Sequence, residues 1–326
     1  MRLQPKRIMC TVDFSDFTDE VLGYSVALCK QFNAALLLVH IVTDEGTYLG
    51  KERMAFEKLK KANILKAKKL LGDMVEDLTI DHAIVVIEGN PSDEICRLAM
   101  EKEIDLVITA THGKSGIKKI LLGSVTEKLI KSVKSPTLVL NTKEHEFISL
   151  ADYEMKLKKI LVGCDFSPDS KLAFDYGLSL AQEFQAEIYL THVIKPTEYV
   201  ELKALDYINV IPGNFAHWHN SDYFEMQKKV TAESSEKIKG LRKRLERQLY
   251  YMLPEECKNW CTPYTDVLTG EPYEELVKYA KEQQIDMIVL GIRGHTLWEK
   301  LLVGSTTDRV IRHAPCPVLA VRQIEE

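Results

Sequence analysis

The sequence lacks any long uninterrupted run of apolar residues. Its longest, Ala34 to Val39, is far shorter than the about eighteen residues that a membrane-spanning helix needs. The basic residues at the N-terminus lead into only a short apolar stretch, Ile8 to Cys10, so the apolar core of a secretory signal is missing as well. We therefore expect a protein that neither spans a membrane nor is secreted.

An excess of positive charge is also missing. Lys and Arg number 43 and Asp and Glu number 48, which gives a formal net charge of −5 and argues against binding of nucleic acid through overall charge. Cysteine is scarce, with 7 residues in 326, and most of these lie in apolar runs where a thiol serves as a small hydrophobic side chain. This excludes a disulfide scaffold and predicts a reducing, cytoplasmic location.

The chain repeats itself, as a length of roughly two domains allows. Residues 6–15 match residues 158–167 at an offset of 152 positions. Farther on, residues 89–140 match residues 270–321 at an offset of 181 positions. The offset grows from 152 to 181 between these matches, so the second copy carries 29 additional residues.

These matches predict two related domains, at 1–143 and 156–326, joined by a polar stretch. The additional residues enlarge the middle of the second domain, between 195 and 269. In the first copy, short apolar runs predict strands at 8–12, 36–42, 83–87, 106–110 and 136–140. Segments of helical character at about 51–75 and 124–133 predict two of its helices.

Near-continuous apolar strands separated by helices indicate a parallel sheet covered on both faces. The predicted fold class is therefore α/β, with two tandem, doubly wound, five-stranded domains of Rossmann-like type. Sheets of this kind bind ligands beyond the carboxyl ends of their strands, where the strand order reverses. We expect the site in the loops after the first and fourth strands.

The loop after the fourth strand of the second copy is rich in glycine. It reads G-x-x-G-x9-G-S, with Gly291, Gly294, Gly304 and Ser305 at the fixed positions. Glycines let the backbone approach a ligand closely, and the start of the helix at Ser305 presents N–H groups that suit phosphate. The alternative is that the glycines make tight turns and the serine caps a helix.

The first copy has the same loop with one departure. Ala110 replaces the first glycine, whereas Gly113, Gly123 and Ser124 keep the spacing. Ser124 is followed three residues later by Glu127, the spacing of a capping box. An added methyl group at Ala110 would crowd a ligand, so the second copy is predicted to hold the more secure site.

Each first strand ends in an aspartate, Asp13 in one copy and Asp165 in the other. A carboxylate beside the glycine-rich loop can accept hydrogen bonds from a ribose or hold a metal ion near phosphates. Capping of the following helix is an equally good reading. Ser15 and Ser167 are also predicted N-caps of that helix.

The histidines are predicted to be structural more often than ligating. His40 and His192 end the second strands without a second metal ligand at suitable spacing. The insertion brings two further pairs of potential ligands, His217 with His219 and Cys257 with Cys261. Their spacing is poor for a zinc site, so a lid or interface with buried thiols is the favoured reading.

Both copies resemble universal stress protein domains. In the first copy the resemblance rests on Val12-Asp13-Phe14-Ser15, Leu38-Val39-His40-Ile41 and the loop from His112 to Ser124. In the second it rests on Cys164-Asp165-Phe166-Ser167, Leu190-Thr191-His192-Val193, the loop from Gly291 to Ser305 and Ala314-Pro315-Cys316-Pro317-Val318-Leu319. The chain is thus similar to a tandem universal stress protein.

In that family the G-x-x-G-x9-G-[ST] loop marks the members that bind ATP. The resemblance implies an ATP site, with or without Mg²⁺, in each copy. In the second copy its residues are Asp165, Val193, Gly291, Gly294, Gly304, Ser305 and Thr306. In the first copy they are Asp13, Ile41, Gly113, Gly123, Ser124 and Val125. The implied function is that of a regulatory protein of the stress response.

Two other functions stay open: a slow ATPase or self-phosphorylating enzyme, and a scaffold that binds no nucleotide. No Walker lysine or Ser-His-Asp order supports a dedicated enzyme. The basic runs at 58–69 and 237–247 are expected to be solvated helix faces rather than contacts for nucleic acid or membrane. An unidentified protein partner is expected.

Universal stress protein domains commonly pair with each other through the last strands of their sheets. That pairing would here join 137–140 to 318–321 within one chain as an intramolecular pseudo-dimer, and a further homodimer stays open.

Overall fold

A computed structural model describes residues 4–43, 51–111, 122–141, 147–149, 152–195, 220–294 and 303–323, with side chains from 58 onward in the first long helix and from 236 onward in the second. None of the helices among these residues combines the length and the apolar character of a membrane span. The first half contains β1 (Arg7–Thr11), α1 (Thr18–Phe32), β2 (Ala35–Val42), α2 (Lys51–Val75), β3 (His82–Glu88), α3 (Pro91–Glu101), β4 (Leu106–Ala110), α4 (Ser124–Ser132) and β5 (Thr137–Leu140). The second contains β6 (Lys159–Gly163), α5 (Pro168–Phe184), β7 (Glu187–Ile194), α7 (Asn220–Met252), β8 (Pro263–Thr269), α8 (Pro272–Glu282), β9 (Met287–Gly291), α9 (Ser305–His313) and β10 (Val318–Val321).

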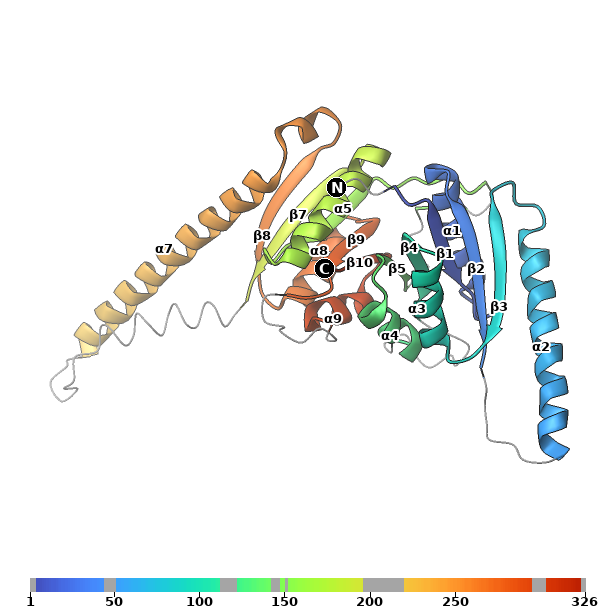
Figure 1. Cartoon of the computed structure of the whole chain (residues 1–326). Coiled ribbons are helices and arrows are strands. Elements are labelled where there is room, and N and C mark those ends of the chain that lie inside the picture. The colour runs from blue at the N-terminus through green and yellow to red at the C-terminus, as the bar shows by residue number, and fades with distance from the viewer. Residues whose placement is uncertain are drawn as a thin grey trace.

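All ten strands form one sheet (Figure 1). Its order is β3-β2-β1-β4-β5-β10-β9-β6-β7-β8, so each half is a doubly wound parallel sheet, with β1 or β6 at the point where the order reverses. The halves join where β5 and β10 pair antiparallel, with Val318 opposite Val139 and Leu319 opposite Leu138. This confirms the predicted α/β fold and the predicted pairing of the last strands within one chain.

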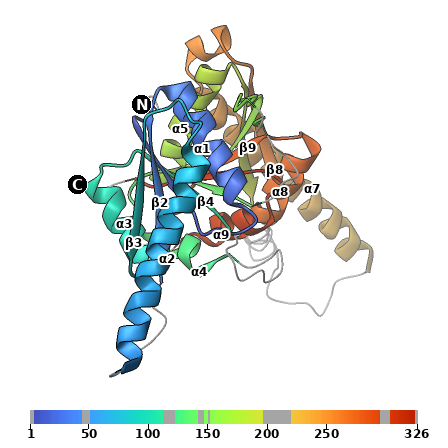
Figure 2. The same cartoon turned by 90° about the vertical axis from the view of Figure 1, so that its right-hand side faces the viewer.

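Helices cover both faces of the sheet. On one face α1, α2, α5 and α7 enclose a core that runs through both halves. On the other face α3 and α4 cover one core, and α8 and α9 cover a second, to which α4 contributes Ile130 and β5 contributes Val139. The two long helices pack at opposite ends of the sheet, α2 on β2 and β3 and α7 on β7 and β8. Figure 2 looks at the α2 end, where this helix lies outermost.

The segment that connects the two halves is predicted to be polar, but part of it is apolar and buried. Phe147 and Ile148 are buried in the shared core, and the Phe147 ring meets the Tyr24 ring edge-on at 4.9 Å. Across the same face, the rings of Phe32 and Phe184 lie 6.2 Å apart at the ends of α1 and α5. The shared core therefore ties the two halves together beside the β5–β10 pair.

Candidate functional site

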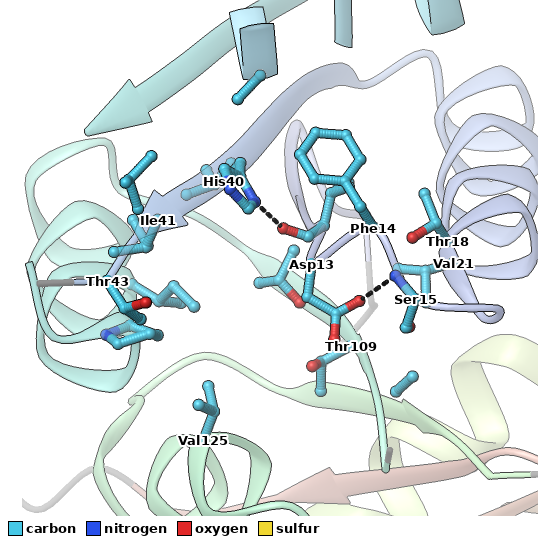
Figure 3. A pocket seen from close by; sticks show the side chains of 18 of the residues that line it. Asp13, Phe14, Ser15, Thr18, Val21, His40, Ile41, Thr43, Thr109 and Val125 are labelled. Carbon is cyan, nitrogen blue, oxygen red and sulfur yellow. Dashed lines mark hydrogen bonds between the residues drawn. The ribbon is translucent and has the colours of Figure 1, made fainter. Parts of the chain in front are cut away.

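A pocket of about 860 Å³ opens at the carboxyl ends of β1, β2 and β4, where the strand order of the first half reverses. Its lining comes from the ends of these strands, the starts of α1 and α4, and one side of α2. Figure 3 shows Asp13, Ile41 and Val125 around it. The position is the one that a doubly wound sheet offers to a ligand, and the volume is in the usual range for a small-molecule site.

A tight turn after β1 fixes the carboxylate of Asp13. Phe14 has a left-handed backbone with φ 56°, and the backbone N–H of Ser15 donates to Asp13 Oδ1 at 3.0 Å. The second half repeats this turn, because Phe166 has φ 63° and Asp165 Oδ1 accepts a backbone N–H at 3.0 Å. A left-handed residue with a side chain is strained, which suits a turn that is held for a purpose.

The histidines at the ends of β2 and β7 hold the same turns in place. His40 Nδ1 lies 2.7 Å from the carbonyl oxygen of Val12, and the His40 ring packs 4.6 Å from the Phe14 ring. His192 Nδ1 lies 2.7 Å from the carbonyl oxygen of Cys164, whose thiol pKa is raised by burial. Each of these contacts supports the predicted structural role.

The helix that follows the glycine-rich loop begins at Ser124. Gly123 is its N-cap and its N–H donates to the carbonyl oxygen of Thr111 at 2.8 Å, while Thr126 Oγ1 donates to the carbonyl oxygen of Ala110 at 2.6 Å. The predicted capping box at Ser124 is wrong, since this serine is the first helical residue and makes no side-chain cap. The first-turn N–H groups of a helix lack partners within the helix, and Ser124, Val125 and Thr126 of this turn line the pocket.

The predicted cap at Ser15 is also wrong, whereas the one at Ser167 is confirmed. Ser167 Oγ accepts the backbone N–H of Ser170 at 3.2 Å, and α5 begins directly after it at Pro168. In the first half, α1 begins only at Thr18, after a turn in which the Thr18 N–H donates to the carbonyl oxygen of Ser15 at 3.1 Å. In the alignment of the two copies, α1 therefore begins later than α5.

In the first half, the structure brings most of the predicted residues into one pocket. Asp13, Ile41, Gly123, Ser124 and Val125 all line it. Ala110 lines it too, and the predicted Gly113 lies outside the described residues.

In the second half, Asp165 lies close to the glycine-rich loop, because a Cβ added to Gly294 would come within 2.8 Å of Asp165 Oδ2. Gly304 is the N-cap of α9, and Ser305 and Thr306 are its first residues. The Gly304 N–H donates to the carbonyl oxygen of Ile292 at 2.8 Å, which repeats the hydrogen bond from Gly123 to Thr111 in the first half. Val193 is buried near the end of β7.

Packing within the protein is enough to require glycine at position 291. A Cβ there would lie 2.6 Å from the carbonyl carbon of Asp169 and 2.7 Å from the backbone nitrogen of Ser170. The early start of α5 therefore requires glycine at the end of β9. Since α1 starts later, the methyl group of Ala110 is accommodated in the first half.

We expect Gly291→Ala to lower the free energy of unfolding by about 1–3 kcal/mol, because the methyl group would overpack against backbone that cannot move aside. Denaturant titration of the full chain measures this. Ala110→Gly, at the matching position of the first half, is the control and should cost about 1 kcal/mol or less. A Gly291→Ala protein as stable as the original would show that α5 has room to shift.

A buried ion pair, which the sequence pattern does not predict, fastens the start of α5 to the loop. Asp169 is 2% exposed and accepts the Nε of Arg293 at 3.2 Å and the backbone N–H groups of Arg293 at 3.0 Å and Gln323 at 2.9 Å. Ser167 Oγ also donates to the carbonyl oxygen of Arg293 at 3.2 Å. When the two copies are aligned, Asp169 occupies the position of Phe17, and this difference is the sequence signal that points to the ion pair.

Two further predictions concern the insertion and the basic runs. The buried Cys257 and the half-buried Cys261 lie in the turn between α7 and β8. His217 and His219 fall outside the described residues. Among the residues that the structure describes, no cluster of three metal-binding side chains occurs. In the first basic run, Lys60 pairs with Glu88. Lys60 also lines the pocket, so this part of the run is not simply a solvated face.

Comparisons with known proteins agree with the fold and its repetition. The model of the universal stress protein family matches residues 5–141, 156–211 and 219–322. A universal stress protein of Methanocaldococcus jannaschii is 30% identical over 167 residues, covering 51% of this chain and 82% of its own. One of Mycolicibacterium smegmatis is 22% identical across 97% of this chain and 96% of its own.

A solved structure shows the same arrangement over the whole length. The universal stress protein from Archaeoglobus fulgidus covers 97% of this chain and 96% of its own, with a TM-score of 0.62 at 18% identity. Because the family model matches most of the chain in both halves, the chain belongs to the universal stress protein family, with two copies of its domain in tandem.

Proposed function

We propose that the protein binds an adenine nucleotide, ATP in the first place, and that occupancy regulates its contacts in a stress response. One observation carries the proposal: in the first half, Asp13, Ile41 and the Gly123–Val125 segment line a single pocket. A carboxylate suits the ribose hydroxyls and a helix start suits phosphate. The adenine would lie along the backbone at Ile41.

The second half is proposed as a matching site. The support is that Asp165 lies beside Gly294, that Gly291 ends β9, and that Gly304, Ser305 and Thr306 form the start of α9. Any Mg²⁺ would be held through the phosphates, with Asp165 as a carboxylate beside the loop. The sequence ranks this site first because it keeps every loop glycine, and that order stays a prediction.

The proposal also covers the organisation and location of the chain. It takes 1–143 and 156–326 as the two nucleotide-binding domains, on the support of the turns and loops that both halves share. It places the protein in the cytoplasm, which suits its seven free thiols, five of them buried. Partner proteins would then bind differently according to whether the pockets hold a nucleotide.

The test is ATP titration of the full chain with a separate variant for each domain. Asp13→Ala and Asp165→Ala should each weaken one site by about tenfold or more, the usual effect of losing hydrogen bonds to a charged group. Asp77→Ala, an exposed carboxylate outside the pocket lining, is the control and should change nothing.

The variant with the larger loss identifies the tighter site. Mass spectrometry of the co-purified nucleotide and assay of ADP in the same samples separate binding from turnover. A full chain that binds no ATP, or two aspartate variants that bind as the original does, would refute the proposal.

A further inference from the structure

The pocket of the first half is larger than the set of predicted nucleotide residues explains. Ile41 and Val125 belong to the core beneath α3 and α4, on one face of the sheet. The lining continues past the end of β1 to the other face, between α1 and α2. We call this part the α2 arm, and its residues are Phe14, Thr18, Val21, Leu59, Asn63, Lys66, Ala67 and Leu70.

The α2 wall of the arm is a stripe of mixed character. Leu59, Asn63, Lys66 and Leu70 are spaced three or four residues apart, so they share one side of the helix. Leu59 is 59% exposed and Leu70 is 39% exposed although both line the pocket. Apolar side chains left open beside a concavity are typical of a wall that a ligand covers.

The α1 part of the lining contributes a buried hydroxyl without a partner. Thr18 is 8% exposed, and its Oγ1 makes no hydrogen bond within the part of the chain that the structure describes. At the matching position of the second half, Ser170 Oγ donates to the carbonyl oxygen of Ser167 at 3.0 Å. A buried hydroxyl without a partner is costly, so a ligand that supplies one would gain from it.

The rest of the arm is aromatic and cationic. The Phe14 ring is only partly buried and lies on the opposite side of the turn from the Asp13 carboxylate, as Figure 3 shows. Rings prefer to pack against other rings at about 4.5–7 Å. Lys66 is exposed on the α2 wall and has no acidic partner among the described residues, whereas Lys60 is engaged by Glu88.

We propose that the α2 arm binds a small aromatic carboxylic acid that carries a hydrogen-bond donor on its ring. The ring lies between Phe14 and the leucines of α2, its donor reaches Thr18 Oγ1, and the carboxylate meets Lys66. This ligand occupies the arm independently of any nucleotide, since none of these three contacts uses a residue assigned to ATP.

The test uses two probe acids that differ by one hydroxyl group, 4-hydroxyphenylacetate and phenylacetate, titrated calorimetrically into the full chain. We expect the phenol to bind about tenfold more tightly, because it gives the buried hydroxyl its missing partner. In Thr18→Val the two acids should bind alike, while the melting temperature rises or stays unchanged. That result would separate a ligand contact from a structural role of the hydroxyl.

Charge is tested on the same helix. Lys66→Glu should weaken 4-hydroxyphenylacetate by about tenfold or more. The matched controls are Lys69→Glu and Leu65→Gln, which change exposed α2 residues outside the pocket lining and should leave affinity within twofold. Tyramine, which has the phenol but no carboxylate, should not bind.

The two proposals fail separately. Asp13→Ala should reduce ATP affinity and leave 4-hydroxyphenylacetate affinity unchanged, and Lys66→Glu should do the opposite. Absence of saturable binding of the phenolic acid, equal affinity of the two acids for the original protein, or equal losses in Lys66→Glu and Lys69→Glu would overturn the assignment of the arm whatever ATP does.

Discussion

Asp169→Ala should lower the free energy of unfolding by about 3–5 kcal/mol, the usual cost of removing one partner from a buried ion pair. The Asp169 side chain is 2% exposed and that of Arg293 is 16% exposed, so water cannot replace the lost carboxylate. The change also strips the acceptor from two backbone N–H groups, those of Arg293 and Gln323. Equilibrium denaturation in guanidinium or urea measures the loss.

The control for this change is another aspartate–arginine pair in the same half. Asp308 and Arg312 pair across one turn of α9, with side chains 30% and 20% exposed. Asp308→Ala should cost only about 0.5 kcal/mol because solvent screens and replaces such a pair. If Asp169→Ala costs no more than Asp308→Ala, the start of α5 is held by its packing and not by this ion pair.

The contacts of Asp169 explain why the two copies are unequal in structure. They draw α5 against the end of β9, where Gly291 leaves room for it. The first half has Phe17 in place of this aspartate, a later helix start and alanine at 110. One substitution at the start of the helix therefore accompanies the change of the loop glycine, and neither needs to reflect a loss of ligand binding.

How far the sequence predicts this structure depends on the range of each interaction. The strand at 106–110 is placed to the residue and the helix at 51–75 likewise, because apolar period and turn residues are local signals. The cap at Ser167 was predicted correctly, but the same reasoning failed at Ser15. Both serines follow an aspartate and an aromatic residue, but only Ser167 is followed by a proline at the first helical position and by the distant contacts of Asp169.

The pocket was predictable only in outline. Topology places Asp13, Ile41 and Gly123 together, since the carboxyl ends of neighbouring parallel strands meet at one edge. The contribution of α2 was not predicted, because the basic composition of 58–69 reads as a solvated face. Which side of a charged helix meets a concavity depends on its packing on β2 and β3, and that packing rests on buried Ala67, Leu71 and Val75.

The second large effect should come from the seam between the halves. Leu138 of β5 and Leu319 of β10 face each other in the antiparallel register and are 1% and 2% exposed. Replacing either by alanine should cost about 2–5 kcal/mol, the range for a buried leucine in a core that cannot collapse. Because the two leucines are neighbours, the loss of unfolding free energy in the double variant should differ from the sum of the two single losses.

The positions of the tryptophans make this experiment a test of coupling between the halves. All three, Trp218, Trp260 and Trp298, belong to the second copy, so their fluorescence reports that half, whereas circular dichroism reports the whole chain. A continuous sheet with a shared core should unfold as one unit, and Leu138→Ala, made in the first half, should lower the fluorescence midpoint and the dichroism midpoint together.

Leu98→Ala provides the comparison, since this residue of the first half is also buried, at 4% exposed, but lies on α3, away from the seam. In a fully coupled chain it also lowers the fluorescence midpoint. If Leu138→Ala and Leu98→Ala both leave the fluorescence transition in place and split the dichroism into two steps, the halves unfold independently. The ten strands would then be two adjoining sheets in energetic terms, and a ligand in one pocket would stabilise its own half alone.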